Sequence, residues 1–279
     1  MKRDLAAEIA ATRLPDDAVA IWSLGQCGFV MKHGATTIGI DLYLSNWVYE
    51  LVGEPWSRTA PPPIEPEALP PLDVVLCTHH HEDHMDKRTL TALRWKEGAK
   101  LVAPRAHLPL LREWGFADSS LVGMNHGETV RLPGVDILAF AGMHADFERD
   151  AEGNHHFLSY GLTLGEIVLY HAGDTIGFPE LVDWVGAAKP DAAFLPINGR
   201  DYRRTAAGIV GNMNYREAAD FANDIGTKLV LPMHYGIFRH NDENPAYFVD
   251  YAYQTYPELP FHLMRLGERF VYWKAPSAE

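Results

Sequence analysis

The stretch Thr78-His79-His80-His81-Glu82-Asp83-His84 indicates the fold and the chemistry of this chain more strongly than any other. It directly follows an apolar run, Val74 to Cys77, that is typical of a buried strand. Imidazoles and carboxylates suit borderline divalent metals, and a sharp loop can direct alternate side chains at two adjacent ions. A solvated turn or a tag remnant explains the run less well, because a tag lies at a terminus and carries no interspersed acids. The stretch therefore predicts a metal site.

The composition indicates a globular chain with a large core. Its 279 residues are 47% hydrophobic and 22% charged, which allows one domain or two. We expect a single domain over residues 1–279, with a proline-rich insertion around residues 47–71. The net charge of −13 argues against nucleic acid or an anionic membrane as a partner. No window reaches the roughly 18 apolar residues that a membrane-spanning helix needs.

Cysteine usage bears on the compartment. The chain has two cysteines, Cys27 and Cys77, and both lie in apolar, strand-like surroundings. Free cysteine is usually buried, so we expect two buried thiols and no disulfide. This usage favours a reducing compartment, and we expect the protein to be cytoplasmic.

Strand-like and helix-like runs alternate along the chain. Strands are expected at residues 19–24, 28–32, 36–40, 74–77, 101–103, 129–132, 135–141, 157–164, 167–170, 192–195 and 228–231. Helices are expected over the first dozen residues, from Asp86 to about Trp95, and at 105–114, 179–188 and 214–225. This order predicts an α/β fold in which two sheets face each other with helices outside, a four-layer αββα sandwich. The segment 47–71 contains seven prolines and is expected to be an extended loop, either a cover over core strands or a wall of the substrate pocket.

Two further apolar strands end in potential metal ligands. The run Ile167 to Tyr170 leads into a glycine turn that carries Asp174, and the run Leu229 to Leu231 leads to His234. Alone, Asp174 could be a helix cap and His234 a buried core histidine. Loops at the ends of rigid strands often display catalytic groups, and three such ends make coincidence a poor explanation.

These motifs resemble those of the metallo-β-lactamase superfamily. The resemblance runs from about Ile21 to Phe238 and rests on Asp41, the histidine loop, the turn around Asp174 and the segment Pro232-Met233-His234-Tyr235. Within the superfamily, the chain looks most similar to the branch that contains L-ascorbate-6-phosphate lactonase, and the segment from Trp22 to Phe29 and Asp41 also resemble that branch. The resemblance implies the αββα fold and one or two divalent ions, with manganese expected for the lactonase and zinc for many relatives. Iron also suits such ligands.

The resemblance also implies a role for each ligand. His79 and His81 would hold one ion, Asp83 and His84 the other, Asp174 would bridge them and His234 would complete the second site. Asp41 would support the site from behind by accepting a hydrogen bond from a ligand or from the loop backbone. The third histidine for the first ion is either His144, which the family pattern favours, or His126. A site with a single ion stays open.

The expected chemistry is hydrolysis. Two ions about 3.5–4 Å apart lower the pKa of a shared water, and the metal-activated hydroxide would attack an ester or a lactone, such as a phosphorylated sugar lactone. Asp83, with Asp41 behind it, is expected to act in catalysis by orienting the nucleophile and passing its proton to the leaving oxygen. Four residues in the segment 196–204 are expected to bind an anionic small-molecule substrate: Asn198, Arg200, Tyr202 and Arg204. A solvated turn or an oligomer contact would explain them equally well.

The leading hypothesis is therefore a metal-dependent, lactonase-like hydrolase. One alternative is a phosphodiesterase or nuclease of the same superfamily, which the acidic net charge disfavours. Another is a non-catalytic metal-binding scaffold, which would be expected to have lost some of its ligands. We expect a homo-oligomer that binds neither nucleic acid nor a membrane.

Overall fold

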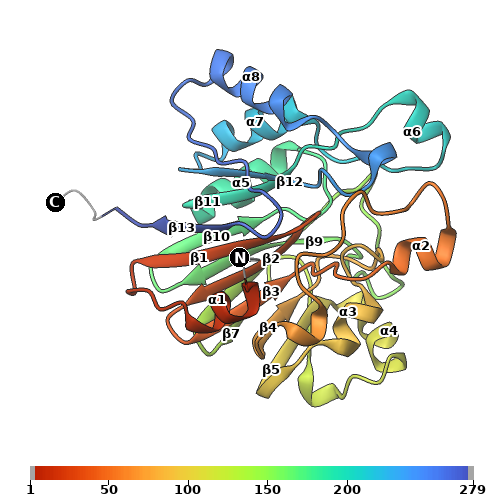
Figure 1. Cartoon of the computed structure of the whole chain (residues 1–279). Helices are drawn as coiled ribbons and strands as arrows, with labels where there is room; N and C mark the ends of the chain where they lie inside the picture. Colours follow the sequence, from red (N-terminus) through yellow and green to blue (C-terminus); the bar gives the residue numbers. More distant parts are fainter. Residues whose placement is uncertain (1–3, 276–279) are drawn as a thin grey trace.

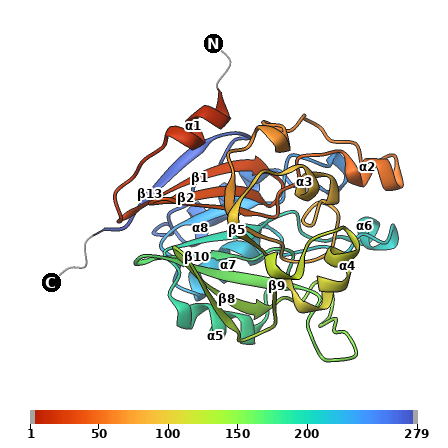
Figure 2. The same cartoon turned by 90° about the horizontal axis from the view of Figure 1, so that it is seen from below.

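The computed structural model describes residues 4–275. Two mixed β-sheets lie face to face, and helices cover their outer faces (Figure 1). A second view shows α1 (Leu5–Ala11) outside one sheet and α5 (Pro179–Ala188) outside the other (Figure 2). The predicted α/β fold with αββα layers is therefore confirmed.

The first sheet has seven strands in the order β13-β1-β2-β3-β4-β5-β6. Their bounds are Arg269–Trp273 (β13), Ala18–Gly25 (β1), Gly28–His33 (β2), Thr36–Ile40 (β3), Leu72–Leu76 (β4), Trp95–Pro104 (β5) and Leu121–Met124 (β6). Strands β1 to β3 form an antiparallel meander, whereas β3 to β6 run parallel. The loops after β3 and β4 therefore leave the sheet at the same edge.

The second sheet has six strands in the order β12-β11-β10-β9-β8-β7. Their bounds are Val230–Met233 (β12), Ala192–Pro196 (β11), Ile167–His171 (β10), Leu158–Leu164 (β9), Val135–Ala141 (β8) and Thr129–Leu132 (β7). Strands β10 to β12 run parallel, and β9 is antiparallel to both β10 and β8. Strands β8, β10, β11 and β12 consequently end at one edge of this sheet.

The remaining helices are short. Within residues 4–275 they are α2 (Trp47–Val52), α3 (Lys87–Ala92), α4 (Leu108–Glu113), α6 (Tyr202–Ala206), α7 (Tyr215–Asp224), α8 (Pro245–Thr255) and four 3₁₀ helices, η1 (Pro66–Ala68), η2 (Arg105–His107), η3 (Asp118–Ser120) and η4 (Arg239–Asn241). Asp86 caps α3, and Asn214 and Glu217 form a capping box at the start of α7. Helix α7 packs on β11 and α8 packs on α7.

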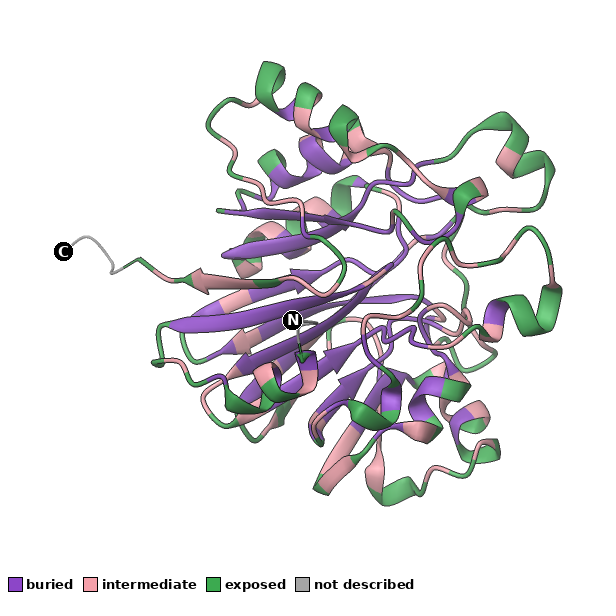
Figure 3. Cartoon of the chain, viewed as in Figure 1, coloured by how far each residue is buried: buried purple, intermediate pink, exposed green. Residues whose placement is uncertain are grey.

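Alternation along the strands builds a core on each side of the first sheet. In β1, Val19 and Ile21 belong to the core between the sheets, whereas Ala20, Trp22 and Leu24 belong to the core under the helices. Burial on both faces explains why these strands read as nearly continuous apolar runs (Figure 3).

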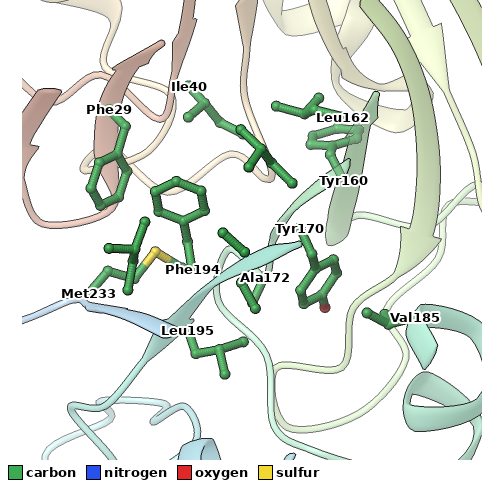
Figure 4. Packing of buried hydrophobic residues seen from close by; sticks show 14 of the residues in the cluster. Phe29, Ile40, Tyr160, Leu162, Tyr170, Ala172, Val185, Phe194, Leu195 and Met233 are labelled. Atoms are coloured by element: carbon green, nitrogen blue, oxygen red, sulfur yellow. The ribbon is translucent and has the colours of Figure 1, made fainter. Parts of the chain in front are cut away.

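Aromatic side chains join the two sheets. The rings of Phe29 and Phe194, from opposite sheets, lie 4.6 Å apart between centroids (Figure 4). The hydroxyl of Tyr160 donates a hydrogen bond of 3.0 Å to the carbonyl of Cys77, directly before the histidine loop. These contacts fix the position of the loop after β4 relative to the second sheet.

The structure corrects several expected boundaries. The segment 47–71 begins with helix α2, because its prolines start only at Pro55. Ile64 and Leu69 of this segment pack into the core, so its second half is a cover, as one of the two readings held. Trp95 begins β5 and does not end α3, because Trp95 pairs with Leu72 of β4. Strands β6 and β13 and helices α6 and α8 were not predicted.

Both cysteines are free and buried, as predicted. No helix within residues 4–275 is long and apolar enough to cross a membrane. The single-domain organisation, the cytoplasmic location and self-association stay predictions.

Candidate metal centre

Seven side chains with metal-ligand chemistry converge where strands of both sheets end. His79, His81, Asp83 and His84 lie in the loop after β4, His144 lies after β8, Asp174 after β10 and His234 after β12. All seven were predicted as ligands from the sequence. They meet because the two sheets face each other and the relevant strands end at the same side of the molecule.

One group consists of His79, His81 and Asp174, whose potential ligand atoms all lie within 4.8 Å of one another. His79 Nε2 and His81 Nδ1 are 2.9 Å apart. The ring of His144 lies 5.2 Å from that of His81, measured between centroids. His144 Nδ1 is buried and has no hydrogen-bond partner among the described residues. This donor set, three imidazoles and a carboxylate, fits a transition-metal ion.

A second group consists of Cys27, His84, Asp174 and His234, again with ligand atoms within 4.8 Å of one another. Asp174 Oδ1 is 3.2 Å from His84 Nε2 and 3.3 Å from His234 Nε2. Asp83 Oδ2 is 3.7 Å from His84 Nε2. Because Asp174 belongs to both groups, its carboxylate lies where it could bridge two ions.

Sequence reasoning missed two neighbours of this second group. Cys27 was expected only as a buried hydrophobic residue, and burial followed by the nearby charge of Asp174 raises the pKa of its thiol. Gln26 Nε2 donates a hydrogen bond of 2.8 Å to Asp83 Oδ2 and lies 3.3 Å from both ring nitrogens of His234. The resemblance of the segment 22–29 to the lactonase-containing branch was the one signal that pointed to these residues.

Asp41 lies beneath the histidine loop and is fully buried. Its carboxylate accepts hydrogen bonds from the Thr78 backbone N–H at 2.8 Å, the Thr78 hydroxyl at 2.7 Å and His84 Nδ1 at 2.8 Å. With Nδ1 as the donor, Nε2 is the nitrogen that carries the lone pair in the neutral His84 ring, and it faces Asp174. Asp41 does not line the cavity, and it contacts the loop backbone and His84 in the way that the resemblance implies, so we assign it a positioning role.

Left-handed backbone gathers at the site. Gln26, Asp41 and His234 have φ angles of 55°, 46° and 62°. Such conformations cost on the order of 1–3 kcal/mol each in residues other than glycine, and they cluster at functional sites. At Gly173, where φ is 59°, a Cβ atom would lie 2.7 Å from Thr78 Cβ, so the turn before Asp174 requires glycine.

Burial keeps three of the histidines neutral. It lowers the pKa of His79 well below the usual value, with the neighbouring His84 adding to the effect. Burial also lowers the pKa of His81 and of His144 to about 4. These imidazoles therefore offer lone pairs at neutral pH, which is the form that binds metals.

The two histidines beside Asp174, His84 and His234, behave in the opposite way to the three histidines above. Burial opposes the charged form of His84 and His234, but Asp174 and Asp83 together, with Asp41 also acting on His84, outweigh burial and raise the pKa of both histidines. Burial likewise opposes the Asp174 carboxylate, and the two histidines hold its pKa well below the usual range. The contact between His84 Nε2 and Asp174 Oδ1 nevertheless lacks the geometry of a hydrogen bond, and neither atom has another hydrogen-bond partner among the described residues. Two facing buried atoms left unpaired in this way fit a site for a cation.

His126 lies outside both groups. Its Nδ1 accepts a hydrogen bond of 3.1 Å from the Ala141 backbone N–H, and its ring lies 4.1 Å from that of Trp184. The structure therefore favours His144 over His126 as the third histidine.

The two arginines expected to grip an anionic substrate have carboxylate partners of their own. Arg200 Nη1 donates to Glu217 Oε2 at 2.8 Å, and Arg204 forms an ion pair with Asp201. Neither arginine lines the cavity beside the metal groups. The sequence could not foresee the pairing of Arg200, because Glu217 lies 17 residues further along the chain on α7.

Asn198 and Tyr202 do not line the cavity either. Asn198 is buried and hydrogen-bonded to Asn212 and Asn241, each at 3.1 Å. Tyr202 is 87% exposed on α6. The expected substrate-binding role of all four residues in the segment 196–204 is therefore not supported by their positions.

A cavity of about 240 Å³ opens over the metal groups. Its polar floor is formed by His81, Glu82, Asp83, His144, Asp174 and His234. Its walls include Val48, Leu51, Val52, Trp56, Ile209 and Val210, together with Gly208 and Asn241. The apolar walls come from α2 and the segment just after it and from the loop after α6. The helices α2 and α6 lie at the same end of the molecule (Figure 1). The first half of the segment 47–71 thus forms a cavity wall.

The chain matches known proteins over most of its length. The family described as the β-lactamase superfamily domain matches residues 39–235. A protein named metal-dependent hydrolase from Rubrobacter xylanophilus is 31% identical over 213 residues, which cover 74% of this chain and 81% of that protein. The chain therefore belongs to the metallo-β-lactamase superfamily.

Solved structures agree with this fold. A metallo hydrolase from Ignicoccus hospitalis has a TM-score of 0.70 at 23% identity, covering 92% of this chain and 100% of that one. An isothiocyanate hydrolase from Delia radicum gut bacteria has a TM-score of 0.72 at 19% identity, covering 91% of this chain and 100% of that one. At these identities the similarity shows the fold alone.

Proposed function

We propose that this protein is a metal-dependent hydrolase that cleaves an ester or a lactone. The observation that carries the proposal is the pair of ligand groups that share Asp174 beneath one cavity. The name of the Rubrobacter relative, a metal-dependent hydrolase, supports the same activity.

The residues present fit one or two divalent ions. His79, His81 and His144 would hold the first with Asp174, and His84, Asp83 and His234 would hold the second with the same carboxylate. Imidazole and carboxylate donors suit zinc, manganese and iron, and a thiol such as that of Cys27 favours zinc among these. Ions held there lower the pKa of bound water and stabilise negative charge on oxygen.

Asp83 is the residue that we assign to proton transfer. Its side chain is 16% exposed and lines the cavity, whereas the Asp174 side chain is 6% exposed. Gln26 holds Asp83 Oδ2 by a hydrogen bond of 2.8 Å, which fixes the carboxylate towards the cavity. Asp83 can accept the proton of an attacking water and return it to the leaving oxygen.

The cavity favours a neutral substrate with an apolar group. Within the described chain its lining contains no lysine or arginine, while its floor carries three carboxylates. An anionic group would find no cationic side chain there to pair with, whereas the apolar walls bury hydrocarbon favourably. The phosphorylated sugar lactone expected from the resemblance is therefore the less favoured substrate, and the same lack of cationic side chains disfavours a nucleic-acid backbone.

Paired substrates test this proposal. Metal-stripped protein reconstituted with Zn²⁺, Mn²⁺ or Fe²⁺ should hydrolyse an alkyl-substituted γ-lactone faster than a phosphorylated sugar lactone, and a chelator should abolish both rates. Asp83→Asn should reduce kcat, whereas Glu82→Gln, which removes a charge from the same cavity, should not. Equal rates with and without metal would contradict the proposed function. A preference for the phosphorylated lactone would contradict the substrate class alone.

A further inference from the structure

A second cluster of histidines lies beside the metal centre and shares no residue with it. It consists of His80 in the loop after β4, His107 at the end of η2 and His156 just before β9. The centroid of the His107 ring lies 4.8 Å from that of His80 and 5.0 Å from that of His156. Each histidine offers a ring nitrogen, and these three nitrogens all lie within 4.8 Å of one another.

The hydrogen bonds of this cluster leave nitrogen atoms available. His107 Nε2 donates to the carbonyl oxygen of His156 at 2.8 Å, so Nδ1 of His107 carries the lone pair. A backbone carbonyl that accepts the second ring N–H is the arrangement that orients metal-binding histidines. His80 Nδ1 is buried and has no hydrogen-bond partner among the described residues. A buried nitrogen without a partner is costly unless another ligand satisfies it.

We propose that His80, His107 and His156 form an additional binding site for a divalent transition-metal ion. Three imidazoles without a carboxylate or a thiol suit Zn²⁺, with Co²⁺ as its spectroscopic substitute. His107 is buried, while His80 and His156 are partly exposed, so an ion could enter from solvent and keep a water as its fourth ligand.

The position of this site gives it a defined consequence. The His80 ring lies 6.4 Å from that of His79 and 5.0 Å from that of His81, both measured between centroids. An ion on His80 would tie the histidine loop to η2 and to the segment before β9. The site goes beyond the proposed hydrolase activity, because it would bind its ion whether or not the neighbouring centre hydrolyses anything.

Packing alone is the competing explanation for the cluster. Imidazole rings can contact one another as aromatic groups without any ion, and Phe157 lies 6.0 Å from the His80 ring between centroids. A phenylalanine in place of one histidine would preserve such packing but supply no nitrogen. The variant His156→Phe therefore separates the two explanations.

The test is the number of metal ions retained after dialysis against metal-free buffer, counted by elemental mass spectrometry. His107→Ala and His156→Phe should each retain one Zn²⁺ fewer than the wild type, whereas the control His33→Ala, outside both centres, should retain the wild-type number. The double variant His84→Ala/His234→Ala disables the second group of the principal centre. Adding His156→Phe to this double variant should still remove one further Zn²⁺ relative to the double variant alone.

Cobalt gives an independent readout. Co²⁺-loaded wild type minus Co²⁺-loaded His156→Phe should show a visible absorption band of a nitrogen-ligated tetrahedral ion. Unchanged metal content in both His107→Ala and His156→Phe, with no such difference band, would overturn the proposal. That result would leave the hydrolase proposal intact, because His156 is not among the ligands of the principal centre.

Discussion

Replacing Asp41 by asparagine should weaken metal binding without touching the cavity. The Asp41 carboxylate accepts the Thr78 backbone N–H at Oδ1, and the Thr78 hydroxyl and His84 Nδ1 at Oδ2. In Asp41→Asn the amide oxygen must stay with the backbone N–H, so the amide NH₂ takes the place of Oδ2. This group donates only, and it favours the His84 tautomer that carries its proton on Nε2. That proton faces Asp174, where the cation should lie.

The size of the effect follows from the hydrogen bond that is lost. To bind a metal through Nε2, His84 must carry its proton on Nδ1, which then faces the amide N–H of the variant. A lost hydrogen bond to a charged group costs about 1.5–3 kcal/mol. Since about 1.4 kcal/mol corresponds to a tenfold change in affinity, the Kd for the second ion should rise by roughly 10- to 100-fold.

Competition with a chromophoric chelator measures this Kd. The matched control is Asp191→Asn, which alters another buried carboxylate, one that accepts the Val168 backbone N–H at 2.9 Å and pairs with Lys228 and Lys274. Asp191 lies before β11, at the opposite end of that strand from the metal centre. Wild-type affinity in Asp41→Asn would refute the tautomer argument. An equal loss in Asp191→Asn would show that the effect is a general loss of stability.

Three further predictions follow from the site. Metal binding should release protons, because the neighbouring carboxylates, chiefly Asp174, raise the pKa of His84 and His234 in spite of their burial. The affinity measured by calorimetry should therefore fall as the pH is lowered from about 8 to about 6, and a pH-independent Kd would contradict this. Val210→Arg adds a positive charge to the cavity wall and should raise kcat/KM several-fold for an anionic lactone relative to a neutral one, so an unchanged ratio would contradict the charge argument. Arg200→Ala should leave that ratio unchanged. It should lower the free energy of unfolding in urea by about 1 kcal/mol or less, because the side chains of its ion pair, Arg200 and Glu217, are 40% and 35% exposed.

Much of the arrangement could be predicted because the ligands follow apolar strands. Buried strands read as apolar runs, and the residues just after them are placed by the sheet. The histidine loop after β4, Asp174 after β10 and His234 after β12 follow this rule, and the structure brings them together. The same rule suggested Arg200 after β11, which instead turns towards Glu217.

The remainder depends on contacts that sequence spacing does not encode. Gln26 and Cys27 reach the site from the turn between β1 and β2. Their role could not be predicted from the sequence, because it depends on the contact of this turn with Asp83. The apolar wall formed by α2 and Val210 joins segments far apart in the chain. Helix α2 was not predicted, because the prolines that follow it led us to expect an extended loop over the whole segment 47–71.

The central claim is that the ligand groups sharing Asp174 hold one or two divalent ions. Anomalous diffraction from crystals grown with Zn²⁺ or Mn²⁺ tests it most directly. We predict one peak between His79, His81 and Asp174, or two peaks with the second between His84, Asp174 and His234. A crystal soaked in either metal that showed no anomalous peak at Asp174 would contradict the claim.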